Sequence, residues 1–393
     1  MSFQAKDVIS SNIDMQSSLE ERSAQEARQK RPRLFFIDHL RVVLTILVVL
    51  HHLAITYGAF GGLPGGWYYE EVTKDPPTVG LLTIFVVVNQ TFFMGLFFLL
   101  SGYFTPGSYE RKGAKAFLRD RLLRLGIPLL VFTFLINPVV IYIGYRMHMP
   151  FWQLLLHYGA FGVGPLWFVE ALLLFDCGYA LWRWLSQKWA KPAEATNKPP
   201  TLLAVGLFIL ALAVVAFIVR IWFPTGWWFQ PLNFQIAYFP QYISLFIIGT
   251  IAARRNWFLN VPSWMGKLGL AAAFCTIIVG AICIILMGGI NSFFGGLLVC
   301  FLEAILCVGM SLGLLVLFRQ RFNRQGFWGK LLSREAYGVY VIHALVVTGF
   351  CVAIAGLQLY PLLKMAVAAL ITVPLCFGCA YLLRKLPGVR VIL

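Results

Sequence analysis

The chain has 393 residues, of which 60% are hydrophobic and only 12% are charged. This composition excludes an ordinary soluble domain and predicts an integral membrane protein. The formal net charge is +16, but the basic residues are dispersed through loops. They are not gathered on one face with aromatic partners, and this argues against a nucleic-acid-binding protein.

The chain begins with a polar arm and continues as a series of apolar runs. Residues 1–33 are polar and of mixed charge, which predicts a flexible cytosolic segment. From residue 34 onward, runs of roughly 20 apolar residues recur, separated by short Gly, Pro and Trp-rich breaks. They predict an all-α, polytopic bundle of about ten transmembrane helices, over residues 34–56, 79–104, 125–145, 164–185, 201–222, 235–252, 267–287, 293–318, 336–356 and 361–383.

Basic residues are distributed unequally between the two sides of this predicted bundle. If the N-terminus is cytosolic, the opposite side holds only Lys74, Arg146, Arg220 and Lys364. Loops rich in Lys and Arg stay on the cytosolic side of a membrane. The distribution therefore predicts a multi-pass protein of the cell membrane with both termini inside, N-in and C-in.

The first predicted span carries charged and titratable residues. His52 follows Arg41 by eleven positions, and eleven steps of about 100° return to nearly the same helix face, roughly 16 Å along the axis. An arginine within a span is costly, so this stripe should face the bundle interior or a watery cavity. The alternative is structural, with Arg41 reaching the cytosolic surface and His52 bonded to a neighbouring helix.

The loop after the second span carries a further basic set. In KGAKAFLRDRLLRLGIP, Arg121 and Arg124 are three residues apart and share a helix face. Guanidinium groups suit a phosphate-bearing ligand, because their planar fork pairs with two phosphate oxygens. Contact with anionic lipid explains the same charges.

Several segments, in this order and spacing, resemble the membrane-bound acyltransferase type 3 family, which includes glucan succinyltransferases and sugar O-acetyltransferases. They are FIDHLRVVLTILVVLHH with Arg41 and His52, FFLLSGYF at 97–104, the pair Arg121 and Arg124, PLWFVEALL at 165–173, and YGVYVIHALV at 337–346.

The resemblance implies that residues 34–393 form an acyltransferase-type transmembrane domain. It implies transfer of an acyl group from cytosolic acyl-CoA, a co-substrate rather than a bound cofactor, to a carbohydrate or other hydroxyl acceptor. In the family the first-span histidine is catalytic, which is His52 here, and arginines near the cytosol contact the coenzyme. His52 would act as general base or carry the acyl group covalently. Membrane lipid is the other expected partner, and no cluster of metal ligands stands out.

Two further residues are candidates for the site. Glu170 is predicted to orient His52, because both lie a turn or two from the outer end of their spans. His343, predicted about two turns into its span from the cytosolic side and near the depth of Arg41, is assigned to the coenzyme or to a polar wall. Helix-to-helix hydrogen bonds explain either residue equally well.

Other polar and aromatic residues have open roles. Asp176 and Glu303, near mid-membrane, should face inward. Trp67, in an outer loop, either stacks on a sugar ring or anchors the loop at the interface. The rival function is a proton-coupled transporter of a small acid or lipid-linked sugar, with Arg41, His52 and Glu170 as its site.

Overall fold

The computed structural model describes residues 33–60, 67–71, 73, 75–157, 161–186, 197–230, 232–287 and 293–392. Residues 36–393 form one compact unit, and the fold and site below belong to it. The predicted N-terminal arm, except Arg33, lies outside the described residues.

Within those ranges the chain is helical and forms no strand. The elements are α2 (Phe35–Thr56), α3 (Pro76–Arg121), η1 (Leu122–Gly126), α4 (Ile127–Val131), η2 (Phe132–Ile136), α5 (Asn137–Gly144), α6 (Phe151–His157), η3 (Gly164–Leu166), α7 (Trp167–Ser186), α8 (Leu202–Trp222), η4 (Ile236–Tyr238), α9 (Phe239–Arg254), α10 (Trp257–Asn260), α11 (Ser263–Met287), α12 (Phe293–Arg321), α13 (Phe327–Ala353), α14 (Pro361–Leu383) and α15 (Val389–Ile392).

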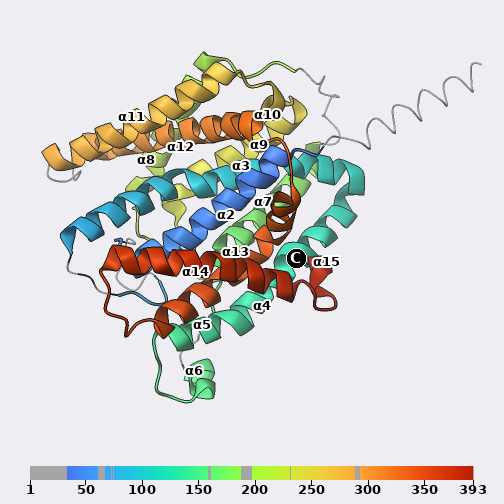
Figure 1. Cartoon of the computed structure of the whole chain (residues 1–393). Coiled ribbons are helices and arrows are strands. Elements are labelled where there is room, and N and C mark those ends of the chain that lie inside the picture. The colour runs from blue at the N-terminus through green and yellow to red at the C-terminus, as the bar shows by residue number, and fades with distance from the viewer. Residues whose placement is uncertain are drawn as a thin grey trace, which may run out of the picture. The chain divides into compact units, whose positions relative to one another are not determined.

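The predicted all-α membrane fold is confirmed. In the described part of the chain, nine helical runs are long and apolar enough to cross a bilayer. The predicted span 79–104 and all but the last residue of 125–145 fall in one such run, Pro76–Gly144. Gly113, with φ 74° and ψ 165°, interrupts its helical geometry, and Figure 1 shows the teal chain turning back after α3. One continuous run therefore supplies two predicted spans.

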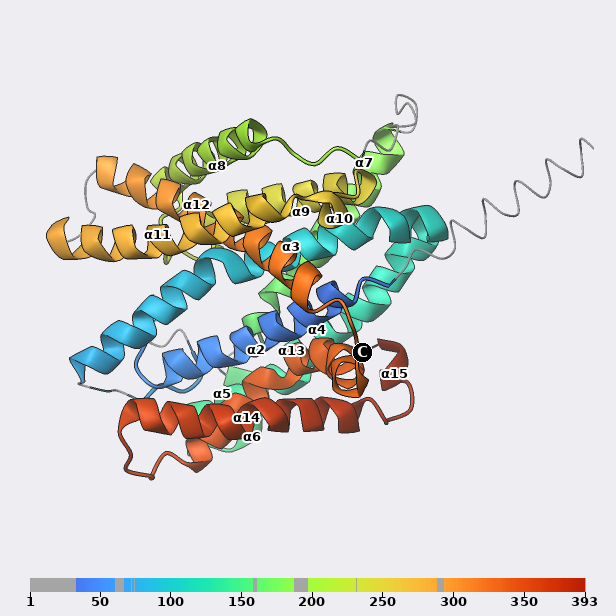
Figure 2. The ribbon, with the colours of Figure 1, turned by 45° about the horizontal axis from the view of Figure 1, so that its top comes forward.

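Helix α2 occupies a central place among the helices. Figures 1 and 2 both show α2 between α3 and α13. Around it, α3 packs against α7, α9 and α12, while α13 packs against α5 and α14. A side chain on α2 therefore has neighbours from both α3 and α13.

Two glycines let α3 and α9 approach closely. A Cβ atom at Gly102 would overlap the carbonyl of Phe246, and one at Gly249 would overlap the carbonyl of Leu99. Small residues permit this kind of backbone contact between helices in a membrane, where no hydrophobic force drives helices together. The contact fixes α3, which forms one wall of the site.

Basic side chains meet at the end of the bundle where α2 begins. His39 of α2 bonds through Nδ1 to the carbonyl of Phe322, just after α12. Arg384, after α14, pairs with Glu335 of α13 at 3.3 Å, and the Tyr337 hydroxyl donates to the carbonyl of Arg124. We call this region, with Arg121, Arg124, Arg334 and Arg384, the basic end.

Candidate active site

His52 is held in one orientation by its own helix. Its Nδ1 lies 2.9 Å from the carbonyl oxygen of Val48, one turn earlier in α2. A carbonyl can only accept, so Nδ1 carries the proton and donates it to this bond. In the neutral ring Nε2 is then the acceptor. The backbone thus presents His52 as a base through Nε2.

His343 of α13 repeats this arrangement opposite His52. Its Nδ1 lies 2.6 Å from the carbonyl oxygen of Tyr340, so Nε2 is again the unprotonated nitrogen. This Nε2 is buried and has no hydrogen-bond partner in the described chain. The two imidazole centroids are 5.0 Å apart. Two acceptor nitrogens from separate helices therefore belong to one site.

The position of His343 corrects the sequence prediction. Residue 343 was expected near the depth of Arg41, because the span was predicted to begin at 336. Helix α13 instead begins at Phe327, nine residues earlier. The longer helix carries His343 past the depth of Arg41 and up to His52. Its first turns contain Lys330, Arg334 and Glu335, which lower the local hydropathy and hide that start from the sequence.

Trp67 covers the two histidines. Its indole stacks on His52 with centroids 3.9 Å apart and an interplanar angle of 25°, and it lies 6.3 Å from His343. Only 6% of Trp67 is exposed, which excludes the predicted role as an interfacial anchor. Nothing in a glycine-rich loop indicates that its tryptophan packs onto the preceding helix.

A cavity of about 620 Å³ adjoins the histidines. His52 and Tyr340 line it together with aromatic, amide and acidic side chains from α3, α7, α12 and the segment 225–242. Pockets of this size hold small-molecule ligands, with a few polar groups that set orientation. The cavity is therefore large enough to hold a small ligand beside His52.

The neighbouring His51 has a different environment. Its Nδ1 accepts from the Asn89 side-chain amide at 3.3 Å, and its ring stacks on Phe93 at 5.1 Å. His51 thus packs mainly on α3, whereas His52 meets Trp67 and α13. The two adjacent histidines thus have separate surroundings, and the choice of His52 as the catalytic residue stays a prediction.

No hydrogen bond joins Glu170 to His52 among the described residues, and the orienting role of Glu170 stays a prediction. The nitrogen that needs orienting, Nδ1, is bonded to Val48, so a carboxylate partner there is unnecessary. Glu170 lies in the first turn of α7, and its Oε2 is buried without a hydrogen-bond partner among the described residues. The structure assigns the orienting task to the backbone and leaves the role of Glu170 untested.

The predicted phosphate-binding arginines have acidic partners at the basic end. Nε of Arg121 lies 2.9 Å from Oδ2 of Asp176, which is completely buried. Arg124 pairs with Asp120 at 3.1 Å and is largely exposed. Asp176, predicted to face inward, therefore does so with a partner. These arginines lie apart from the histidines: Tyr337, which contacts Arg124, is about 9 Å along α13 from His343.

Arg41 lies on α2 between these two regions. Its side chain is partly buried, and its carbonyl accepts from the Thr45 hydroxyl at 2.9 Å. The helical geometry of α2 keeps Arg41 and His52 on one stripe, roughly 16 Å apart along the axis. The predicted stripe shared by Arg41 and His52 thus follows from the geometry of α2 alone.

The chain is similar to known proteins over most of its length. A family model described as an acyltransferase domain matches residues 34–381. Proteins named glucans biosynthesis protein C, from Salmonella agona and Salmonella dublin among others, are 27% identical over 263 residues. The match covers 62% of this chain and 65% of each relative, so it spans just under two thirds of their length.

Proposed function

The chain belongs to the acyltransferase domain family, and on that premise we propose that it is an integral membrane O-acyltransferase. It moves an acyl group, such as acetyl or succinyl, from cytosolic acyl-CoA to a hydroxyl of a carbohydrate or similar acceptor. The name of its relatives favours a glucan. The observation that carries the proposal is the fixed, unprotonated Nε2 of His52 beside a ligand-sized cavity.

His52 acts as the general base in this proposal. Nε2 takes the proton of the acceptor hydroxyl as its oxygen attacks the thioester carbonyl carbon. The carbon–sulfur bond then breaks, the acyl group remains on the acceptor oxygen, and coenzyme A leaves as the thiolate, which takes up the proton that Nε2 of His52 had accepted. His343 supplies a second acceptor nitrogen to the same site.

In this proposal the coenzyme enters from the basic end, and that end lies on the cytosolic side of the cell membrane. Arg124 is exposed and suits a phosphate group, because guanidinium forms paired bonds with phosphate oxygens. Arg121, already paired with Asp176, shares its outer nitrogens with a second phosphate oxygen. Arg41 lies on the route from this end toward His52.

Release of coenzyme A tests the proposal. The purified protein in lipid nanodiscs is given acetyl-CoA or succinyl-CoA, with and without glucose oligosaccharides, and free thiol is measured. His52→Gln should lose about 10²–10⁴-fold in turnover, the usual contribution of a general base. His51→Gln, one residue away and also lining the cavity, is the matched control and should lose much less.

Two outcomes would contradict this function. If the wild type consumes no acyl-CoA with any acceptor, transferase activity is ruled out and the transporter hypothesis takes its place. Equal losses in His51→Gln and His52→Gln would contradict the assignment of His52 as the base.

A further inference from the structure

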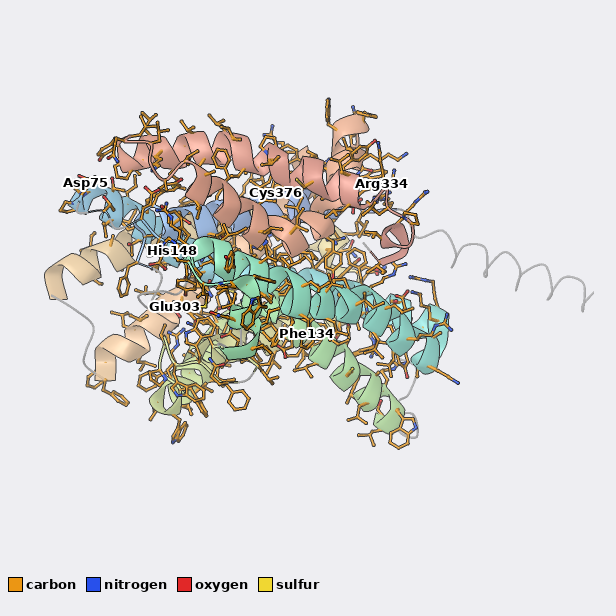
Figure 3. All side chains as sticks on the ribbon, turned by 90° about the horizontal axis from the view of Figure 1, so that it is seen from below. Asp75, Phe134, His148, Glu303, Arg334 and Cys376 are labelled. Carbon is orange, nitrogen blue, oxygen red and sulfur yellow. The ribbon has the colours of Figure 1, made fainter. Side chains whose placement is uncertain are left out.

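A charged pair lies in the wall of the cavity that His52 lines. Nη2 of Arg220, near the end of α8, donates to Oε2 of Glu303 on α12 at 2.6 Å. Glu303 lines the cavity together with His52. Figure 3 shows Glu303 between Asp75 and Arg334, which mark opposite ends of the helices. The base and this carboxylate therefore share one ligand space.

Arg220 is held on several sides. Besides Glu303, it contacts the Cys300 sulfur at 3.5 Å, and its guanidinium lies 5.2 Å from the ring centroid of Tyr238. Its side chain is only 13% exposed. An arginine fixed in this way holds Oε2 of its carboxylate partner in place, as expected of a preorganised binding group.

Glu303 has bonding capacity beyond this ion pair. A carboxylate offers about four acceptor positions on two oxygens. In the described part of the chain, the one hydrogen bond to the Glu303 side chain comes from Nη2 of Arg220 and reaches Oε2. The side chain is 24% exposed and borders the cavity. An ion pair that only joined α8 to α12 would not need a carboxylate open to a ligand space.

The segment before α9 adds groups suited to a sugar. Gln230, Asn233 and Gln235 line the cavity, and each side-chain amide both donates and accepts hydrogen bonds. Trp167 and Trp228 line it as well, offering flat apolar faces for the carbon–hydrogen face of a sugar ring. A ligand with many hydroxyl groups would satisfy both sets, whereas a simple alcohol would use few of them.

We propose that Glu303, held by Arg220, binds neighbouring hydroxyl groups of a carbohydrate acceptor and thereby sets which hydroxyl faces Nε2 of His52. The proposal rests on the acyltransferase function above. Glu303 is a specificity-determining residue in this scheme. It accepts hydrogen bonds from the acceptor and takes no part in proton transfer.

The test separates acceptor binding from acyl-CoA chemistry. Glu303→Gln is compared with the wild type in nanodiscs, with acetyl-CoA or succinyl-CoA and a panel of α- and β-linked glucose oligosaccharides. The KM for the oligosaccharide should rise about 10- to 100-fold, the effect expected when hydrogen bonds to a charged group are lost. The KM for acyl-CoA, and its hydrolysis without acceptor, should not change.

Glu335→Gln is the matched control. Glu335 is also paired with an arginine, Arg384, but it does not line the cavity, so its substitution should leave the oligosaccharide KM unchanged. Glu303→Asp keeps the charge and should give an intermediate KM. An oligosaccharide KM that is the same in Glu303→Gln and in the wild type would overturn the proposal.

Direct binding tests the carbohydrate-binding role of Glu303 even if the proposed transferase function fails. Equilibrium binding of the same oligosaccharides, labelled with tritium, is measured on the wild type and both glutamine variants without acyl-CoA. Binding weakened in Glu303→Gln but retained in Glu335→Gln supports the site. No binding to the wild type, or equal binding to both variants, overturns it.

Discussion

The imidazole of His52 on α2 lies 5.0 Å from that of His343 on α13, and each ring gives its Nδ1 proton to a backbone carbonyl of its own helix. Both rings therefore present Nε2 as an acceptor. Two bases held by backbone bonds need no neighbouring carboxylate to set their tautomers. This relationship gives the first prediction.

His343→Gln should lower turnover about 10- to 100-fold, which is less than the loss in His52→Gln. The reason is that His52 lines the cavity, whereas His343 contacts the ring of His52 from α13. The measurement is coenzyme A release at saturating acyl-CoA and acceptor. His343→Asn serves as a second variant of similar polarity. A larger loss in His343→Gln than in His52→Gln would make His343 the base instead.

Trp67 holds the face of His52 by stacking at 3.9 Å. Trp67→Phe keeps a flat ring and should lower kcat only a few-fold, whereas Trp67→Ala removes the cover and should lower kcat about 10-fold or more. Ring contacts of this kind contribute about 0.5–1.5 kcal/mol beyond their buried area. Equal activity in Trp67→Ala and in the wild type would show that the stack does not position His52.

The buried pair of Arg121 and Asp176 should matter most when only one partner is lost. Asp176→Asn leaves Arg121 without its carboxylate, and breaking a buried ion pair this way costs about 3–5 kcal/mol. The double variant Arg121→Gln with Asp176→Asn should cost less than the sum of the two single variants. Thermal unfolding in detergent measures this cycle, and strict additivity would mean that the pair is not coupled.

Asp75 caps α3 outside the membrane spans and should make stability depend on pH. Hydrogen bonds from the Thr78 hydroxyl, the Tyr360 hydroxyl and the Thr78 backbone N–H lower the pKa of Asp75 below its usual value. Because the folded pKa is the lower one, this stabilisation is present above the unfolded pKa. It is lost as the pH falls through the folded pKa.

The Asp75 prediction is checked by thermal unfolding between about pH 6 and about pH 3. Wild type should lose more stability than Asp75→Asn over this range, because asparagine still caps the helix but does not titrate. Glu110→Gln, an exposed change elsewhere on α3, is the control. Parallel curves for wild type and Asp75→Asn would contradict the assignment.

Most of the fold was predictable because its signals are local. Apolar runs of bilayer length gave helices that overlap all ten predicted ranges. The error at α13 arose because its first turns contain Arg334 and Glu335, which lower the local hydropathy although the backbone is already helical. Helix ends are the least certain part of any sequence prediction.

The site was only partly predictable. Arg41 and His52 share a stripe because eleven residues make just over three whole turns of one helix, so this relationship is written in the order of the residues alone. The packing of the helices brings His343 and Trp67 to His52, pairs Asp176 with Arg121, and places Glu303 on the cavity that His52 lines. Periodicity fixes where a side chain points on its own helix, whereas its partners depend on how helices distant in sequence pack against one another.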